Sequence, residues 1–455
     1  MLSADHSVKQ KGPIGRALRN AGWLLGGNGL GGLFSLAYLG IATRSLGLDG
    51  FGRFALILAY GGAAANIVGF QSWQTVIRYG ASHMAEGQPG RLRRVLAFAA
   101  GLDVAAALLG AILAAAAALA FGSILGWSVD DQRLAAVFSL SLIVGVRGMP
   151  VGLLRLLNRF DLAACGELAV PAMRLIGAST VAALGGGILG YLIAWSAADL
   201  AATVAVWFFA CRELRLRGIH RDGSRVAGVL SENPGLWRFT WTTNLASSLW
   251  LFWFQAPVLV VGWLAGPVGA GAFRIATQIG NAPSKPIIAL ARSIYPEFAR
   301  IQAVQSGAAL LPVIKRTAGI AALFGLISIV CMTWIGKWLL LVIAGPAYVS
   351  AYPMLVLLTI ASAVGFAGFG LEPALVAIGR PALALGTSAL ITFLFCAALV
   401  MFLLLWGPIG AAVATIVGQF CSITLYAAAL KMGLRSAHLG HPVRAAFVDE
   451  PGDGI

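Results

Sequence analysis

A stripe of basic and amide side chains runs along one strongly apolar segment of the chain, residues 271–296. Its members are spaced by four, three, four and seven positions: Arg274, Gln278, Asn281, Lys285 and Arg292. On a helix this spacing places them along one side, because residues three and four apart are neighbours. Guanidinium and ammonium groups hold anionic oxygens by charge-assisted hydrogen bonds. The stripe predicts an anion-binding wall. The alternative is packing, with Arg274 reaching a surface and Lys285 paired with an acid.

Three amides are placed to extend that wall. Asn244 and Gln255 lie in the preceding apolar segment, 239–264, where amides beside aromatic rings suit the hydroxyl groups of a sugar. Asn66 corresponds to Lys285 under an internal repeat of 219 positions, which is described below. We therefore expect Asn66, Asn244 and Gln255 to line the same substrate cavity.

A second set of ionisable residues could neutralise itself or bind ions. Two acids and two bases fall at similar depths in four consecutive apolar segments: Asp103, Arg147, Arg174 and Asp199. A structural network is one interpretation, since unpaired charges in hydrocarbon are unfavourable. In the other, an acid changes protonation and couples movement to a proton or Na⁺ gradient. Glu372 has the same two interpretations, with Arg316 as its candidate partner.

No metal or organic cofactor is expected. The cysteines are scattered singly, with no CxxC motif and no histidine at ligand spacing. They are best explained as small apolar side chains. The five are Cys165, Cys211, Cys331, Cys396 and Cys421.

The composition indicates a membrane protein. Hydrophobic residues make up 59% of the 455, charged residues only 11%, and the mean hydropathy is +0.86. A soluble domain carries about 25% charged residues. Apolar runs of about 20 residues, long enough to cross a bilayer as helices, recur along the chain. The expected spans are 20–43, 53–77, 94–121, 133–157, 163–186, 188–210, 239–264, 271–296, 314–342, 348–370, 382–405 and 408–430.

The net charge of +15 is distributed as in a membrane protein, and no nucleic-acid partner is expected. If the spans alternate in direction, most of the 32 Lys and Arg residues face one side. By the positive-inside rule that side is cytoplasmic, and both termini lie there. The first span is too long for a secretory signal and lacks an A-x-A site, so it is expected to stay uncleaved. The basic residues of the opposite side are Arg44, Arg53, Arg133 and Lys337.

One glycine-rich turn is written twice, as GLDGFGRF at 47–54 and GPVGAGAF at 266–273, 219 positions apart. Three other pairs have nearly the same offset: Gly126 with Gly345, GILG at 187–190 with GPIG at 407–410, and RFDLA from Arg159 with RPALA from Arg380. Such glycines are also common in unrelated tight turns. The constant offset favours two six-helix halves in one orientation, with a substrate site near the midplane between them. We expect Gly50 and Gly269 to share a positive-φ backbone.

The repeat predicts an all-α polytopic protein with five parts. A basic link with an exposed SENPG motif should join the two halves. The parts are a cytoplasmic N-terminal tail (1–19), an N-terminal six-helix bundle (20–210), a cytoplasmic linker (211–238), a C-terminal six-helix bundle (239–430) and a cytoplasmic C-terminal tail (431–455).

Several motifs resemble those of a known exporter family. They are LGLDGFGRFALILAYGG, QTVIRYGASH, RFDLAA, VGAGAFRIATQIGNAPSKPIIALARSIYPEFARI, GPAYVSAYPMLVLL and ALVAIGRPALAL. Together they are similar to the Wzx-type flippases of the multidrug/oligosaccharidyl-lipid/polysaccharide exporters. The loop RYGASHMAEGQPGRLRRV lacks the acid-and-base signature of the major-facilitator carriers, which also have two six-helix halves.

The resemblance implies a MATE-like, V-shaped pair of bundles in the bacterial inner membrane. Such a protein would move an undecaprenyl-diphosphate-linked oligosaccharide from the cytoplasmic to the periplasmic leaflet by alternating access. Its partners would be that anionic lipid-linked glycan, membrane lipids and other polysaccharide-assembly proteins.

The sequence leaves two alternative functions open. An ion-coupled exporter of drugs or small molecules could use the same scaffold, although a cationic stripe disfavours cationic drugs. A membrane glycan polymerase or ligase would need acid–base groups on the periplasmic side. The short loops there offer only Asp130 and Asp131, which are expected to form a solvated turn, and there is no P-loop. The protein is therefore not expected to be an enzyme.

Overall fold

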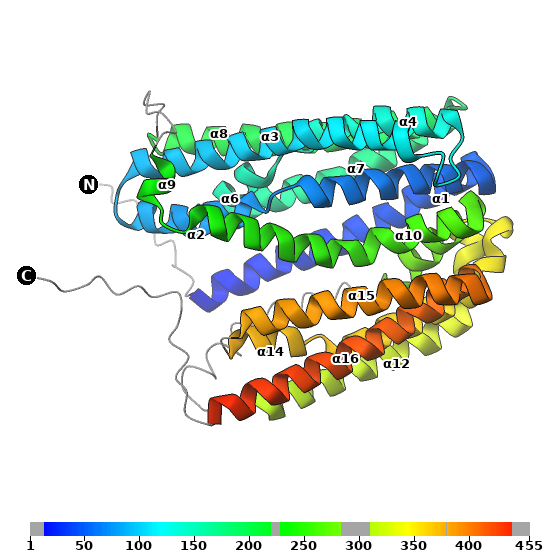
Figure 1. Cartoon of the computed structure of the whole chain (residues 1–455). Helices are drawn as coiled ribbons and strands as arrows, with labels where there is room; N and C mark the ends of the chain where they lie inside the picture. The colour runs from blue at the N-terminus through cyan, green and yellow to red at the C-terminus, as the bar shows by residue number, and fades with distance from the viewer. Residues whose placement is uncertain (1–12, 220–227, 284–309, 379, 439–455) are drawn as a thin grey trace, which may run out of the picture. The chain divides into compact units, whose positions relative to one another are not determined.

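The computed structural model describes residues 13–219, 228–283, 310–378 and 380–438 (Figure 1). Within these ranges every regular element is a helix, in agreement with the all-α prediction. The elements before residue 245 are α1 Pro13–Val68, α2 Ser72–Ala85, α3 Pro89–Phe121, α4 Val129–Ser139, α5 Ser141–Val144, α6 Gly148–Leu156, α7 Phe160–Ala183, α8 Ile188–Leu216, α9 Val229–Glu232 and the start of α10 Leu236–Gly280. They are followed by α12 Leu310–Ile343, the 3₁₀ helix η2 Pro346–Ala351, α13 Tyr352–Gly368, α14 Leu371–Ala377, α15 Pro381–Trp406 and α16 Pro408–His438.

Ten helical segments of the described residues are long and apolar enough to cross a membrane. Two of them each overlap two expected spans. Leu30–Ala85 overlaps the spans 20–43 and 53–77, and Trp253–Gly280 overlaps 239–264 and 271–296. The chain is a multi-pass helical membrane protein, as its composition predicted.

The two overlaps have one cause, a sharp kink at the first glycine of each repeated motif. Gly47 has φ 70 and ψ −172, and Gly266, 219 positions later, has φ 74 and ψ 178. A Cβ atom at either position would meet nothing within 4 Å, so backbone conformation alone requires glycine there. The expectation that Gly50 and Gly269 carry the positive φ was wrong. Both lie inside the helices that follow the kinks.

Two other pairs of the repeat also have similar backbones, whereas the pair Gly187 and Gly407 differs in the sign of φ. The similar pairs have φ 75 at Gly126 and φ 98 at Gly345, and φ −95, ψ 58 at Arg159 and φ −115, ψ 52 at Arg380. The repeat is therefore visible in local geometry at three of its four sites.

Two expected spans are interrupted, although continuous helices were predicted. In the first, α1 ends at Val68 and α2 begins at Ser72. In the second, 133–157, the chain leaves α5 at Val144 and begins α6 at Gly148. Irregular backbone at membrane depth is tolerated only where protein or a water-filled cavity satisfies its polar groups. These interruptions therefore mark sites that the surrounding structure must support.

The chain divides into two compact units, each built from several segments. Unit 1 comprises Met1–Tyr38, Val68–Ala115 and Val137–Asn244. In it α7 packs along α8, and α2 packs against α6. A core that includes Leu92, Leu153 and Leu154 fills the space between its helices, each at most 1% exposed.

Unit 2 comprises Leu39–Ile67, Ala116–Ala136 and Leu245–Ile455. In it α15 and α16 lie side by side (Figure 1). α13 packs against both α12 and α16. The helices that follow the two kinks meet at equivalent glycines. A Cβ on Gly52 would lie 2.0 Å from the carbonyl oxygen of Pro267, and one on Gly271 would lie 3.0 Å from the Cα of Gly52. The expected domains were inferred from the sequence repeat, whereas these two units are defined by how the helices pack. The domain boundaries therefore stay a prediction.

Candidate functional site

A half-buried ion cluster in unit 1 joins three membrane-spanning segments. Arg147, the N-cap of α6, donates from Nη2 to Asp199 of α8 at 3.1 Å. Arg174 of α7 donates from Nη2 to the other carboxylate oxygen at 2.9 Å, and its guanidinium lies 4.6 Å from the centre of the Trp195 ring. Arg147 Nη1 and Arg174 Nε are buried atoms that find no hydrogen-bond partner within the described residues. Two bases thus share one acid, and the cluster keeps an excess positive charge and free donors.

Asp103 was expected in the same network, but the structure places it in a separate contact. Its Oδ2 accepts hydrogen bonds from Ser72 Oγ at 2.7 Å and from the backbone N–H of Met149 at 3.0 Å. The residue is 8% exposed. Among the described residues it has no ion-pair partner, because Arg147 is turned to Asp199.

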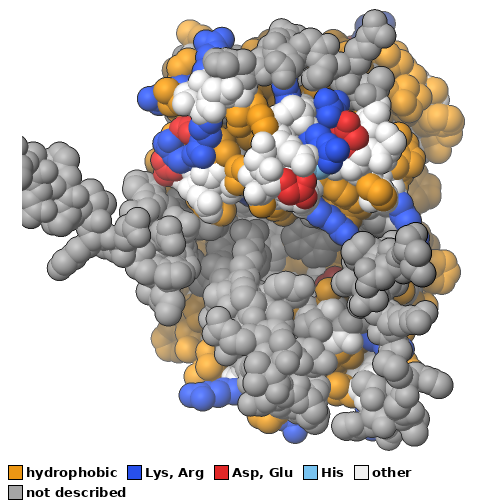
Figure 2. Space-filling model, turned by 90° about the vertical axis from the view of Figure 1, so that its left-hand side faces the viewer, with side chains coloured by type: hydrophobic (Ala, Val, Ile, Leu, Met, Phe, Trp, Pro, Cys, Tyr) orange, Lys and Arg blue, Asp and Glu red, His pale blue; other side chains and the backbone are white. Residues whose placement is uncertain are grey.

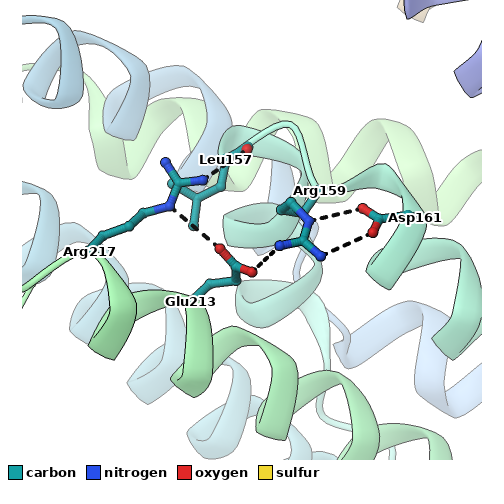
Figure 3. Close-up of polar contacts among 5 residues, drawn as sticks. All are labelled: Leu157, Arg159, Asp161, Glu213 and Arg217. Carbon is teal, nitrogen blue, oxygen red and sulfur yellow. Dashed lines mark hydrogen bonds and ion pairs between the residues drawn. The ribbon is translucent and has the colours of Figure 1, made fainter. Parts of the chain in front are cut away.

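A second ion cluster surrounds Glu213 at the turn between α6 and α7 (Figure 3). Arg159 donates from Nη1 to Glu213, and from Nε and Nη2 to Asp161, both at 3.1 Å. Arg217 approaches Glu213 at 3.5 Å, and its Nη2 donates to the carbonyl oxygen of Leu157 at 3.5 Å. The hydrogen bonds to Asp161 raise the pKa of the Arg159 guanidinium. This cluster fixes the turn and the end of α8.

Sequence reasoning missed the Glu213 cluster. In the sequence Arg159 stands out only as part of a repeated turn, and the acid that binds it lies 54 positions further along. The one available signal was Asp161, two positions after an arginine at a helix start. No local pattern connects Arg159 with Glu213, so only the packing of α7 along α8 shows the contact.

The linker segment around SENPG is bound to α2 and α3 in unit 1. Arg94 donates to both carboxylate oxygens of Glu232, at 2.8 and 2.7 Å. His83 Nε2 lies 2.8 Å from Asn233 Oδ1, and both residues are buried. The prediction of an exposed motif was therefore wrong for Asn233. The Arg94 hydrogen bonds lower the pKa of Glu232.

The face that carries the ends of α2 and α3 is strongly charged. Figure 2 shows Lys and Arg side chains with Asp and Glu side chains among them on this side of the molecule. Arg78 also lies with its guanidinium 4.5 Å from the centre of the Phe239 ring, at the start of α10. Charge pairing and cation–π contacts therefore act together at this end of unit 1.

Only part of the anion-binding stripe lies in the described residues. Arg274 and Gln278 are half-buried on the part of α10 that follows Gly266. The side-chain oxygen of Asn281 accepts a hydrogen bond from Ser362 Oγ of α13. Lys285 and Arg292 lie outside the described residues, so the stripe stays a prediction.

The three amides expected to line one cavity fall in different units. Asn244 is 5% exposed and ends unit 1, whereas Asn66 and Gln255 belong to unit 2. Ser248 Oγ donates to the carbonyl oxygen of Asn66 at 3.1 Å. The amide of Gln255 lies against Gly62, where a Cβ would come within 2.8 Å of Nε2. Its Oε1 is buried and has no partner in the part of the chain that the structure describes. Their shared role in substrate binding stays a prediction.

Glu372 does not make its candidate salt bridge. In the part of the chain that the structure describes, it forms no ion pair, either with Arg316 or with another base. Both side chains are exposed. A structural salt bridge with Arg316 is therefore not supported as the role of Glu372.

Asp131 differs from the expected solvated turn. It is 8% exposed and accepts a hydrogen bond from Arg53 Nε at 2.7 Å, while Asp130 is exposed. Arg53 and Asp131 line a cavity of about 100 Å³ together with Trp127 and Trp263. Arg53 and Asp131 are 78 positions apart in unit 2, so no local sequence pattern predicts this contact.

Comparisons with known proteins show the family of the chain. Residues 17–302 match the family model described as "Polysaccharide biosynthesis protein". The chain is 30% identical over 341 residues to Inner membrane protein YghQ of Escherichia coli (strain K12), covering 74% of this chain and 95% of that protein.

Two solved structures share the fold. One is an inward-facing multidrug resistance MATE family transporter of the MOP superfamily, with a TM-score of 0.70, 14% identity and coverage of 91% of this chain and 95% of that chain. The other is the lipid II flippase MurJ in an inward closed conformation, with a TM-score of 0.70, 11% identity and coverage of 93% and 90%. At these identities the likeness concerns the fold.

Proposed function

Since the chain belongs to the polysaccharide biosynthesis protein family, as its motifs indicated, we propose that it is a flippase for lipid-linked glycans. Its substrate is an oligosaccharide repeat unit carried on undecaprenyl diphosphate. The protein moves this unit from the cytoplasmic to the periplasmic leaflet by alternating access, and the unit is then used in O-antigen or exopolysaccharide assembly.

The observation that carries the proposal is the surplus of half-buried basic groups in unit 1. Arg147 and Arg174 share Asp199, and each keeps a buried donor atom without a partner. Buried donors without partners are unfavourable by about 1–3 kcal/mol. A diphosphate would supply the missing acceptors and balance the charge. The stripe of Arg274, Lys285 and Arg292 adds basic groups of the same chemistry.

The proposal includes the location of the protein, its orientation in the membrane and its partners. We place the protein in the bacterial inner membrane with both termini in the cytoplasm, because most Lys and Arg residues fall on that side of the expected spans. Membrane lipids and other polysaccharide-assembly proteins are its partners, and no chemical step is assigned to it. Reporter fusions after Arg94 and Arg225 should report cytoplasm, and fusions after Asp131 and Lys337 should report periplasm.

The direct test uses purified protein in liposomes that contain a fluorescent undecaprenyl-diphosphate oligosaccharide. With protein present, the label in the inner leaflet should become accessible to a membrane-impermeant quencher within the assay. Arg174→Gln should slow this exchange about tenfold or more, because a charge-assisted hydrogen bond contributes about 1.5–3 kcal/mol. Arg174→Lys should retain part of the rate, since charge remains and geometry changes.

A second set of variants tests Lys285, with Lys337 as the matched control. Lys285→Ala should slow flipping and Lys285→Arg should restore part of it, while Lys337→Ala, an exposed lysine on the opposite side, should act as wild type. Wild-type protein that leaves the label in its original leaflet contradicts the proposal. Transport of cationic drugs without glycan flipping would instead establish the drug-exporter alternative.

A further inference from the structure

Asp103 lies where two interrupted helices meet a third. It is near the middle of α3, Pro89–Phe121, in a membrane-spanning segment. One oxygen, Oδ2, accepts hydrogen bonds from Ser72, the first residue of α2, and from the N–H of Met149 in the first turn of α6. A single carboxylate oxygen therefore holds the starts of both helices.

The contact is closely packed. A Cβ added to Gly148 would lie 2.2 Å from Ser72 Oγ and 2.8 Å from Asp103 Oδ2. Only a glycine lets the start of α6 approach this closely. The helices cannot move apart at this point without breaking the two hydrogen bonds to Asp103.

Both groups bound to Asp103 are neutral. Charged and titratable groups on the neighbouring elements lie elsewhere or are engaged with one another. On α2 they are Arg78, Tyr79 and His83, which lie further along the helix. On α6 they are Arg147 at the N-cap and Arg155 within the helix. Arg174 on α7 and Arg147 both pair with Asp199 on α8 in the ion cluster. The carboxylate is thus stabilised by two hydrogen bonds and by the N-terminus of α6, and no base among the described residues forms an ion pair with it.

We propose that Asp103 is a proton-binding switch that controls the separation of α2 and α6. As a carboxylate it accepts both hydrogen bonds and holds the helix starts together. When it takes a proton from the aqueous phase, its Oδ2 becomes a weaker acceptor and the group becomes neutral. A neutral carboxyl is far less costly than a carboxylate to leave without these partners in a membrane interior. Release of the proton restores the clamp.

The switch deepens the proposed function and rests on it for its physiological role, the coupling of glycan movement to proton movement. Discontinuous helices at membrane depth are where transporters place their ion sites. The interruptions before Ser72 and before Gly148 provide such elements on both sides of one acid. The geometry of the clamp itself requires no glycan.

The test is hydrogen exchange measured by mass spectrometry on the full-length protein in lipid nanodiscs without glycan. Peptides that cover 145–156 and 69–80 are followed from about pH 8 to about pH 4, a range that includes the titration of most carboxyl groups. After correction for chemical exchange, protection of these peptides should fall about tenfold as the pH decreases, because the acceptor of the Met149 amide loses its charge. Asp103→Asn should show the low protection at every pH.

Ser72→Ala keeps the carboxylate and removes one donor, so its protection should fall at a higher pH than in wild type. Asp130→Asn is the matched control, since Asp130 is an exposed acid, and it should keep the wild-type response. Protection that is independent of pH in wild type, or a wild-type response in Asp103→Asn, overturns the switch. An intact switch in protein that flips no glycan would overturn the proposed function alone.

Discussion

The turn that leads into α7 and the turn that leads into α15 have similar backbones but different surroundings. Arg159 and Arg380, 221 positions apart, are the N-caps and share the same region of φ and ψ. In the first turn Arg159 binds Asp161 and Glu213. At the same offset the second turn has apolar residues in place of these two acids, Ala382 and Leu434.

The difference shows that the backbone of this turn does not depend on the ion cluster. The acids of the first turn have another effect. Glu213 lies in the last turn of α8, and it also contacts Arg217, the C-cap of that helix. The cluster therefore fixes the point where the first repeat ends and the linker begins. The turn of the second repeat has no corresponding acids at the equivalent positions.

The largest effect is expected from Glu213→Ala. Its side chain is 4% exposed, and its loss leaves Arg159 and Arg217 without their shared acid. Breaking a buried pair costs about 3–5 kcal/mol. Roughly 2–3 kcal/mol is expected here, because Arg159 is partly exposed and retains Asp161. The measurement is the unfolding free energy or midpoint of the purified protein in detergent.

The matched variant is Asp161→Ala, at a side chain that is 51% exposed. It should cost less than about 1 kcal/mol, as exposed pairs do. Equal losses from the two variants would show that Glu213 has no special part in fixing the linker, and the comparison of the two turns would lose its explanation.

Next in size are the paired kinks, where the two repeats should respond alike. Gly47→Ala and Gly266→Ala should each destabilise by about 1–3 kcal/mol, because a side chain is placed in a backbone region used almost only by glycine. Gly50→Ala is the control, since it lies in a helix and meets only Leu46 at 3.3 Å. Thermal unfolding measures all three. A clear difference between the first two would break the equivalence of the repeats.

The smallest effect concerns the linker, which occurs once and belongs to neither repeat. Arg94 lowers the pKa of Glu232 in the folded protein below its usual value of 4.5. A lowered carboxyl pKa contributes stability above the unfolded pKa, and this contribution is lost as the pH falls through the folded pKa. Hydrogen exchange of a peptide covering 228–236 should therefore increase below about pH 4.5.

Glu232→Gln should weaken protection of that peptide at neutral pH and remove its acid response. Glu86→Gln, at an exposed acid that ends α2, provides the control. An unchanged response in Glu232→Gln would mean that another group releases the linker in acid.

Much of the fold could be predicted because it depends on local composition. Apolar runs of about 20 residues can form little other than helices in a bilayer, where each backbone group must find its partner within the segment. The repeat of turns at Gly47 and Gly266 was also readable, since positive φ demands glycine wherever the turn recurs. The choice of Gly50 and Gly269 was wrong because a motif of several glycines does not reveal which one carries the turn.

The candidate site was less accessible to prediction because its contacts join distant helices. The sequence suggested that Arg147, Arg174 and Asp199 lie at similar depth, and the structure brings all three together. It did not indicate that Asp103 would be bound instead by Ser72 and Met149, since that contact needs two helix interruptions. Counting acids and bases in the sequence can suggest that a group of residues is neutral, but the packing of the helices decides which residues pair.

By itself the sequence determined the membrane class, most of the helical segments, the repeated turns and the family, because hydropathy and glycine placement act within one segment of chain. Only the tertiary structure decided that Asp131 is buried with Arg53, that Asn233 docks on His83, and that one oxygen of Asp103 holds two helix starts. A polar side chain in an apolar setting must take the nearest available partner. Which partner is nearest depends on how helices far apart in the chain pack together.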